Sequence, residues 1–344
     1  MKKFLLATAI LLFSVLEGYA QGCSPIRHIS GISPDVLFKN HTTTNRFVIN
    51  MTNRYFEASN TYRGTKYITD TLVTNRIYSF HISVSAIFNQ GWSLTMSIPV
   101  SANSRRNSLD HGGPQTPKHI THAFGLGDMR LTAYKWLLNS SPKGNIQLGL
   151  GIKFPTGDYR YTDYFFRNDS TKVLAPVDQA IQLGDGGTGI TTEIGGFYSL
   201  SKTIDLFGSV FCLFNPRDQN GVSNLKGRNP TAAELTNNTT VMSVPDQYDF
   251  RGGATIEVKN FVFSAAVRYE RLPIKDLIGE SNGFRRAADV SSVEPGVVYR
   301  ANKQVVFAYV GIPFHRNIEQ TTANNMTPAG FANVIFTFGA QFGL

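Results

Sequence analysis

The stretch WSLTMSIPV, residues 92–100, alternates strictly between large apolar and smaller side chains. Trp92, Leu94, Met96, Ile98 and Val100 share one parity, and serine, threonine or proline stands between them. Successive side chains of a β-strand point to opposite faces, so this pattern predicts a strand with one apolar and one small, largely polar face. The question is which environment requires such a strand.

The same alternation recurs along most of the chain. The polar parity contains few lysines and glutamates, unlike the solvent face of a soluble sheet, and the segments exceed the roughly five or six residues typical of soluble strands. Apolar bulk lies on both faces of 204–214 and 304–314. We expect strands at 45–58, 75–88, 92–101, 125–138, 145–155, 190–199, 204–214, 247–258, 261–271, 290–300, 304–314 and 332–344.

The connections between these strands alternate in length. The short ones contain glycine, proline, asparagine and serine, which suit tight turns. Short turns at one rim and long loops at the other are typical of outer-membrane barrels. The long connections are expected at 59–74, 102–124, 156–189, 215–246, 272–289 and 315–331.

A sheet in hydrocarbon must pair all its backbone polar groups within the protein, so strands can span a membrane only as a closed barrel. We therefore predict an all-β chain, a closed antiparallel transmembrane β-barrel of about twelve strands with short periplasmic turns and long extracellular loops, in the cell outer membrane. The apolar row of 92–100 then faces lipid and the other row faces an aqueous lumen. Tyr55, Tyr78 and Trp92 are expected at the membrane interfaces.

The first twenty residues predict a cleaved secretory signal peptide, because Lys2 and Lys3 precede a short apolar run that ends in small residues at Ala20. Residues 21–44 are then a periplasmic segment or a partial plug, and 45–344 are the barrel. Two cysteines are too few for a disulfide scaffold. The sequence leaves open whether Cys23 is lipidated or pairs with Cys212.

The predicted register brings charges of both signs to the lumen in equal number, so strong ion selectivity is not expected. They suit either a structural ladder, in which each inward charge finds a partner, or a pore lining that orients a polar solute. The expected lumen-lining residues are Arg46, Arg54, His81, Asp128, Arg130, Lys153, Glu193, Asp249, Arg251, Glu257, Arg268, Glu270 and Glu294.

An aromatic cluster in the 156–189 connection is the candidate for contact with the solute, since exposed aromatic clusters often mark contact sites. Asp185, within GDGGTG, resembles a calcium-binding repeat only faintly, because a single copy carries little weight. The cluster consists of Tyr159, Tyr161, Tyr164, Phe165 and Phe166.

Basic pairs in the loops are candidates for binding lipopolysaccharide phosphates, although solvated loop charge is the simpler explanation. The net charge of +9 is scattered, without a basic run, so no nucleic-acid partner is expected. These pairs are Arg105-Arg106, Arg285-Arg286 and Lys226 with Arg228.

His81, Ser83 and Ser85 share a strand face, but a serine hydrolase needs its base within hydrogen-bond reach of the nucleophile. The sequence has no G-x-S-x-G elbow. We therefore expect no enzyme, no cofactor and no metal.

Two motifs resemble those of a known group of barrels. Gly125-Leu-Gly-Asp128 is followed by Pro155-Thr-Gly-Asp158 within LGLGIKFPTGDY. This pairing is similar to the core feature of the Gram-negative outer-membrane family labelled "MetA-pathway of phenol degradation". The resemblance implies a transporter-like barrel and says little about its substrate.

The sequence thus predicts passive transport of small solutes, with hydrophobic or aromatic molecules among the candidates. The protein is expected to be a monomer, surrounded by outer-membrane lipid and lipopolysaccharide and inserted by the outer-membrane assembly machinery. A structural or surface-interaction barrel with a blocked lumen is the alternative, and an outer-membrane lipid hydrolase is a remote one.

Overall fold

The computed structural model describes residues 46–69, 73–88, 91–113, 115–138, 141, 143–168, 170–301, 304–319 and 329–344. The expected signal peptide at 1–20 and the segment at 21–44, which includes Cys23, lie outside these described residues. Their predicted roles therefore stay predictions.

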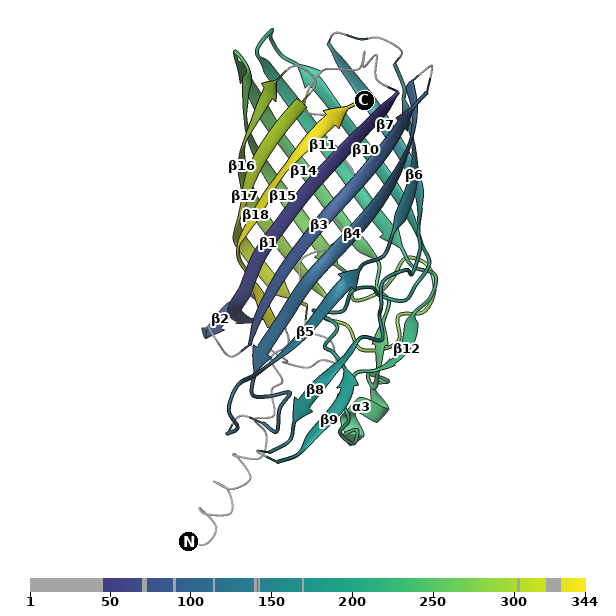
Figure 1. Cartoon of the computed structure of the whole chain (residues 1–344), viewed down its shortest axis with the longest axis vertical. Coiled ribbons are helices and arrows are strands. Elements are labelled where there is room, and N and C mark those ends of the chain that lie inside the picture. The colour runs from purple at the N-terminus through teal and green to yellow at the C-terminus, as the bar shows by residue number, and fades with distance from the viewer. Residues whose placement is uncertain are drawn as a thin grey trace, which may run out of the picture.

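Twelve antiparallel strands form one closed sheet (Figure 1), which confirms the predicted barrel. The barrel closes where the last strand pairs with the first, from Val48 opposite Gly343 onward. In barrel order the strands are β1 (Phe47–Arg63), β3 (Thr74–Ile87), β4 (Trp92–Asn107), β6 (Arg130–Trp136), β7 (Gly144–Lys153), β10 (Gly189–Ser199), β11 (Ile204–Phe214), β14 (Gln247–Val258), β15 (Phe261–Leu272), β16 (Ala288–Ala301), β17 (Gln304–Ile318) and β18 (Ala329–Gly343).

The alternation of WSLTMSIPV has the predicted consequence on β4. Trp92 and Leu94 are exposed on the outer surface, whereas Pro99 of the other parity is buried in the barrel. Exposed apolar side chains continue around the outside, and an uninterrupted apolar band suits contact with lipid tails. Its most exposed members include Phe124, Leu150, Ile194, Val267, Val306, Phe314 and Phe338.

Several strands are longer than predicted, because pairing continues beyond the apolar band into the expected long connections. β1 extends to Arg63 and forms a hairpin with β2 (Lys66–Thr69), and β4 extends to Asn107. The single strand expected at 125–138 is broken. Its first part, β5 (His119–Leu126), pairs with the extension of β4, and β6 follows after a three-residue interruption at 127–129.

This interruption reverses the parity of the inward side chains. Thr121 and Ala123 are buried before it, whereas Arg130, Thr132 and Tyr134 are buried after it. A uniform period of two could not reveal such a reversal.

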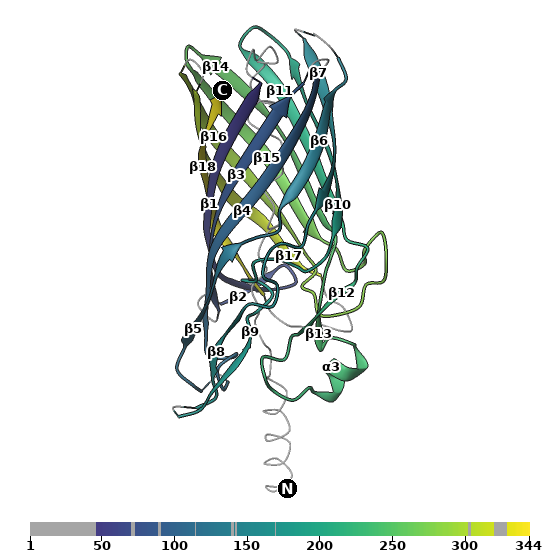
Figure 2. The same ribbon diagram turned by 45° about the vertical axis from the view of Figure 1, so that its right-hand side comes forward.

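The remaining elements all lie at the end of the barrel that carries the long connections, which we call the loop end; the opposite end is the turn end (Figure 2). They are a hairpin of β8 (Thr162–Phe166) and β9 (Lys172–Pro176), a pair of β12 (Gln219–Ser223) and β13 (Val241–Ser243), and the short helix α3 (Ala232–Thr236). Within the described part of the chain, no helix has the length and apolar character needed to cross a membrane.

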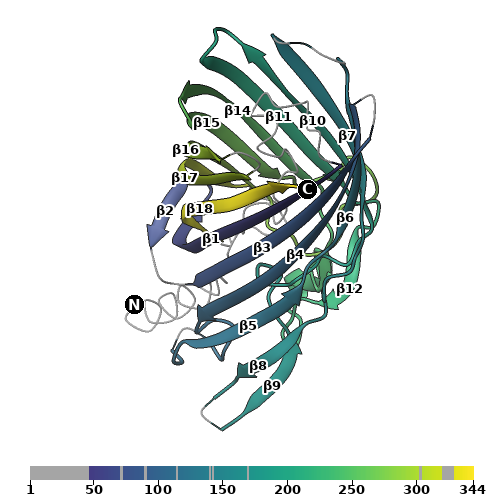
Figure 3. The ribbon, with the colours of Figure 1, turned by 45° about the horizontal axis from the view of Figure 1, so that its top comes forward.

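The apolar bulk found on both faces of β11 and β17 has a simple explanation. Phe207, Phe211, Phe307 and Tyr309 are all buried inside the barrel, while Leu206 and Val306 face outward. Figure 3, tilted toward the turn end, shows how the strands enclose this interior. Its inward side chains form the candidate site.

Candidate functional site

The barrel interior contains nearly all of the charged residues predicted to line it. Arg251 and Glu257 are half-buried there, while Arg46 precedes β1 at the turn end and is exposed, because its strand has not yet entered the barrel. The buried members of the predicted set are Arg54, His81, Asp128, Arg130, Lys153, Glu193, Asp249, Arg268, Glu270 and Glu294.

A belt of ion pairs crosses one wall of the barrel. Arg268 on β15 lies 2.9 Å from Asp249, 3.1 Å from Glu270 and 3.4 Å from Glu294. Arg251 lies 2.7 Å from the other oxygen of Glu294. A buried charge is expensive unless it is paired and hydrogen-bonded, so these groups hold one another in place.

Arginines of the belt and its surroundings also rest on aromatic rings. Arg251 lies over Phe207 and Tyr309, with its guanidinium carbon 5.4 and 5.0 Å from the ring centroids. Elsewhere in the lumen, Arg130 pairs with Glu193 at 3.2 Å and lies 5.1 Å from the centroid of the Phe211 ring. Cation–π contact fixes the flat guanidiniums against the wall.

An apolar cluster fills the same side of the barrel toward the turn end. Its members come from β10, β11, β15, β16 and β17, and the half-buried side chains of Trp136 and Val305 pack against it. Aromatic rings supply most of its volume. The cluster consists of Phe197, Phe207, Val262, Ala266, Val298, Phe307 and Tyr309.

The wall formed by β3 and β4 is different, because it carries small hydroxyl side chains. Ser83 faces Ser97 with 3.0 Å between their Oγ atoms, and Ser85 Oγ lies 2.8 Å from Thr95 Oγ1. These four side chains are half-buried rather than buried. We call them the hydroxyl strip.

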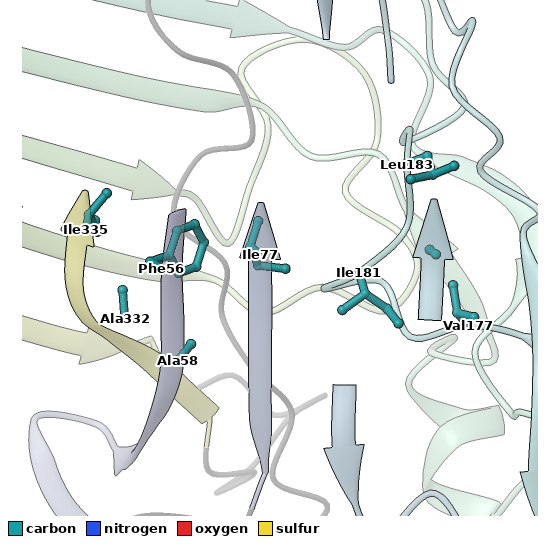
Figure 4. Packing of buried hydrophobic residues seen from close by; sticks show 9 residues of the cluster. Phe56, Ala58, Ile77, Val177, Ile181, Leu183, Ala332 and Ile335 are labelled. Carbon is teal, nitrogen blue, oxygen red and sulfur yellow. The ribbon is translucent and has the colours of Figure 1, made fainter. Parts of the chain in front are cut away.

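A second apolar cluster lies inside the barrel near the loop end (Figure 4). Phe56 and Ile335 on the wall strands are joined by Ile181 and Leu183 of the connection before β10, which folds inward. The amide of Asn103 on β4 donates to the carbonyl of Ile181 at 3.1 Å and fastens this connection to the wall. The barrel interior at the loop end is therefore lined partly by loop residues.

The two Gly-Asp motifs anchor this inward connection. Oδ1 of Asp128 accepts the N–H of Gly157 at 3.0 Å, and Oδ2 accepts the N–H of Asp185, also at 3.0 Å. Lys153 contacts the carboxylate of Asp185 and lies 3.6 Å from Oδ2 of Asp128. Gly184 must be glycine in this backbone, because a Cβ there would collide with Asp128 and lie 2.9 Å from Gly157 O. Asp185, considered above for calcium, is thus part of a lysine pair.

Beyond the barrel, a buried ion cluster joins loops that are far apart in sequence. Asp178 lies 2.9 Å from both Lys226 and Arg286 and 3.9 Å from Arg105. Asp110 lies 2.8 Å from Arg105 and from Lys226. Burial alone would raise the pKa of Asp178, but the charges of Arg105, Arg286 and Lys226 outweigh it and hold that pKa well below the usual range.

This cluster corrects the expected lipopolysaccharide sites. Arg105, Lys226, Arg285 and Arg286 are buried, and Arg285 pairs with Asp276 at 2.6 Å. Four of the six basic residues therefore face carboxylates inside the loops, while Arg228 pairs with Glu234 and Arg106 is exposed. The residues that flank these basic pairs in the sequence do not indicate which distant carboxylates they meet.

The sequence predicts that the five loop aromatics form one exposed cluster, but in the structure they do not. Phe165 is fully buried and stacks on His111, and Phe166 stacks on His119. Tyr161 packs against the apolar cluster at the loop end, Tyr159 is half-buried, and Tyr164 is exposed. The alternation of the β8 strand sends neighbouring rings to opposite sides.

His81 has no arrangement of the kind that a hydrolase requires. Ser83 and Ser85 hydrogen-bond to residues of β4, and Nε2 of His81 has no hydrogen-bond partner among the described residues. The structure therefore brings together no histidine and serine as base and nucleophile on this strand face.

No family model and no curated protein sequence matches this chain. Among solved structures, an outer membrane channel from Pseudomonas putida F1 is similar, with a TM-score of 0.63, 10% sequence identity and coverage of 89% of this chain and 98% of that one. The chain has the fold of an outer-membrane channel. The CymD monoaromatic hydrocarbon channel has a TM-score of 0.46 and 10% sequence identity, and the match covers 91% of this chain and 93% of that one. The KdgM porin has a TM-score of 0.40 and 7% sequence identity, with coverage of 86% of this chain and 99% of that one. At such identities the likeness concerns the fold alone.

Proposed function

We propose that this protein is an outer-membrane channel for the passive movement of small solutes. The observation that carries the proposal is the unequal filling of the interior: aromatic rings and ion pairs occupy one side, while the hydroxyl strip stays half-buried. A barrel built only for structure needs no such unfilled wall, whereas a channel does. Inward charges that already neutralise one another suit a pore without strong ion selectivity.

Hydrophobic or aromatic molecules are the solutes that the mouth supports best. Inside the barrel at the loop end, an apolar cluster is formed by Phe56, Ile77, Ile181, Leu183 and Ile335 (Figure 4). These side chains are buried against one another, so an apolar solute would reach them only when the inward connection moves aside. Apolar solutes gain free energy by leaving water for such a surface. The finer family assignment suggested by the Gly-Asp motifs, and a monomer that contacts lipopolysaccharide and is inserted by the assembly machinery, belong to the same proposal.

Uptake into liposomes tests the transport function. Liposomes containing purified protein should swell in isotonic solutions of small neutral solutes, and planar bilayers should show discrete conductance steps. Protein-free liposomes and liposomes with heat-denatured protein are the controls. Absence of both swelling and conductance in correctly folded protein would contradict the proposal.

A barrel with a blocked lumen is the second candidate, and the buried ion cluster favours it. Asp178 and Asp110 fasten several loops together with Arg105, Lys226 and Arg286, which suits a fixed outer surface for contact with other molecules. Under this alternative, wild-type protein conducts nothing, and removal of the inward connection at 177–188 does not create conductance.

A further inference from the structure

We propose that the turn-end part of the path through the barrel follows the hydroxyl strip of β3 and β4, off the barrel axis, and selects small neutral molecules that carry a hydrogen-bonding group. This inference rests on the proposed transport function and names a route and a different solute class: the cluster at the loop end is apolar, but the strip is polar, so hydrogen-bonding capacity decides which neutral solutes pass along it. Four features of the interior support it.

The opposite wall leaves no space for a solute. β4 and β15 face each other across the barrel, since five strands lie between them in either direction. On the β15 side, Phe207, Phe307 and Tyr309 are all less than 10% exposed and pack into one cluster. A passing molecule would have to displace close-packed rings there.

Glycines let aromatic rings on this side of the interior lie flat against the neighbouring strands. A Cβ on Gly296 would collide with the ring of Tyr309, and one on Gly339 of β18 would collide with the ring of Phe307. On the other flank, a Cβ on Gly149 would collide with the ring of Tyr134. The apolar filling thus extends around the barrel from β18 on one side to β6 and β7 on the other, and the hydroxyl strip of β3 and β4 lies outside it.

The strip itself combines small volume with unused hydrogen-bonding capacity. Each hydroxyl has one donor and two acceptor sites. The Ser83–Ser97 and Ser85–Thr95 pairs use one donor each, so within the described part of the chain every pair keeps a free donor and several lone pairs. Asn50 on β1, opposite Ser83, adds a further half-buried polar group beside it.

The charged belt offers no comparable contacts. Arg268 is shared among Asp249, Glu270 and Glu294, and the side chains of these three acids are no more than 8% exposed. An ion that entered the belt would have to break such pairs, which is expensive in a poorly hydrated interior. Neutral solutes can exchange hydrogen bonds along the strip without that penalty, which is why we infer selection for them.

Single-cysteine labelling tests the route. The background variant carries Cys23→Ser and Cys212→Ser, and cysteines are introduced at Ser83 and Ser97 in the strip and at Ser264 and Ser292 on the opposite wall, all by Ser→Cys. Ser264 and Ser292 are inward and only 9% and 1% exposed. With a small charged methanethiosulfonate reagent, the strip cysteines should react at least ~10-fold faster, because thiol modification follows exposure.

The outcome that overturns the route is equal or faster labelling of Ser264→Cys or Ser292→Cys in folded protein. Failure of the transport function looks different: strip cysteines label faster, yet neither wild type nor any variant conducts. Where the protein does conduct, modification of Ser97→Cys should reduce single-channel conductance, and treatment of Ser264→Cys should leave it unchanged. Reduction by both would also contradict an off-axis path.

Removal of hydroxyls tests the solute class. Thr95→Val combined with Ser97→Ala keeps the strip small but removes two hydroxyls, and it should slow liposome swelling in arabinose severalfold. Thr255→Val is the matched control, because Thr255 is inward but only 3% exposed on β14. Unchanged arabinose flux in the double variant, or faster flux of gluconate than of arabinose in wild type, would overturn selection for neutral hydrogen-bonding solutes.

Discussion

Arg54 on β1 meets Glu270 on β15 inside the barrel, with Nη2 3.4 Å from Oε1, although three strands separate β1 from β15 around the wall. The two residues are 216 positions apart in sequence, and both side chains are 3% exposed. The pair therefore bridges part of the lumen and narrows it.

Replacement of this arginine should open the lumen and weaken the barrel. Arg54→Ala removes the bridge, so single-channel conductance should rise. The free energy of unfolding should fall by about 1.5–3 kcal/mol, the usual value for a hydrogen bond to a charged group, because Glu270 keeps its contact with Arg268. Conductance in planar bilayers and heat-modifiable gel mobility in a urea series measure the two effects.

Arg76→Ala is the matched control, because Arg76 also pairs with a glutamate, Glu57, but its side chain is 63% exposed. Exposed pairs contribute about 0–1 kcal/mol, and this one lies outside the lumen. If Arg54→Ala loses stability without any change in conductance, the bridge is structural only.

Gly184 should tolerate no side chain. In Gly184→Ala the new methyl group meets Asp128 and the carbonyl of Gly157, so the inward connection must shift. We expect a loss of about 1–3 kcal/mol from overpacking and faster proteolysis of the 177–188 connection. Gly252→Ala serves as the control, since the nearest atom to its Cβ is 3.8 Å away. Equal proteolysis of the two variants would show that Asp128 does not hold the connection.

Much of this interior could be predicted from the sequence, because the alternation along a strand decides which side chains face inward. The parity of Arg54, Glu193 or Glu294 follows from counting in steps of two from a lipid-facing neighbour, and the structure buries each of them inside. Parity is lost where a strand is interrupted, as at 127–129, since the alternation carries no mark of the break.

The partners of these charges could not be predicted. Which carboxylate Arg54 meets depends on how many strands close the barrel and how they are staggered, and neither quantity is written in a single strand. The loops pose the same difficulty in a stronger form: Arg105 and Arg286 look like surface charges until folding brings Asp178 between them. In the sequence, Ser83 stands out only as a possible nucleophile beside His81, because the filling of the opposite wall is a three-dimensional property.

Asp178 should control the closure of the loop end. Asp178→Asn keeps the shape but removes the charge that Lys226 and Arg286 share at 2.9 Å. Arg286 loses its contact with the carboxylate, whereas Lys226 and Arg105 keep Asp110. Removal of one partner from a buried ion pair costs about 3–5 kcal/mol, so the loops should open locally while the barrel stays folded. Trypsin should then cleave after Arg105, Lys226 or Arg286, which are protected in wild type by burial.

Glu257→Gln is the control for that experiment. Its partner Arg300 lies 3.1 Å away at the turn end, and both side chains are about one-third exposed. Trypsin should therefore give the wild-type pattern. A wild-type pattern in Asp178→Asn as well would mean that the ion cluster does not fasten the loops.

Mild acid should loosen the loop that contains His111. Burial lowers the pKa of His111 from 6.5 to about 4, and Nδ1 must stay unprotonated to accept the N–H of Phe166 at 3.1 Å. Between those two values the closed loop binds fewer protons than the opened loop, so the contribution of His111 is full above pH 6.5 and is lost as the pH falls toward 4. Asp110 and Asp178 have lowered pKa values, so their contributions decline only below their ordinary value of 3.8.

Hydrogen-exchange protection factors for 108–113 and Phe166, measured from pH 7 to pH 4, should therefore fall as the pH falls. His111→Gln keeps a side chain that can accept the Phe166 N–H but does not titrate, and His119, which stacks on Phe166, remains in place. Protection in this variant should be flat over the same range. If protection in this variant falls with pH as it does in wild type, or if wild-type protection rises on acidification, another group controls the loop. A histidine whose pKa is lowered by folding can only reduce the stability of the closed loop as the pH falls.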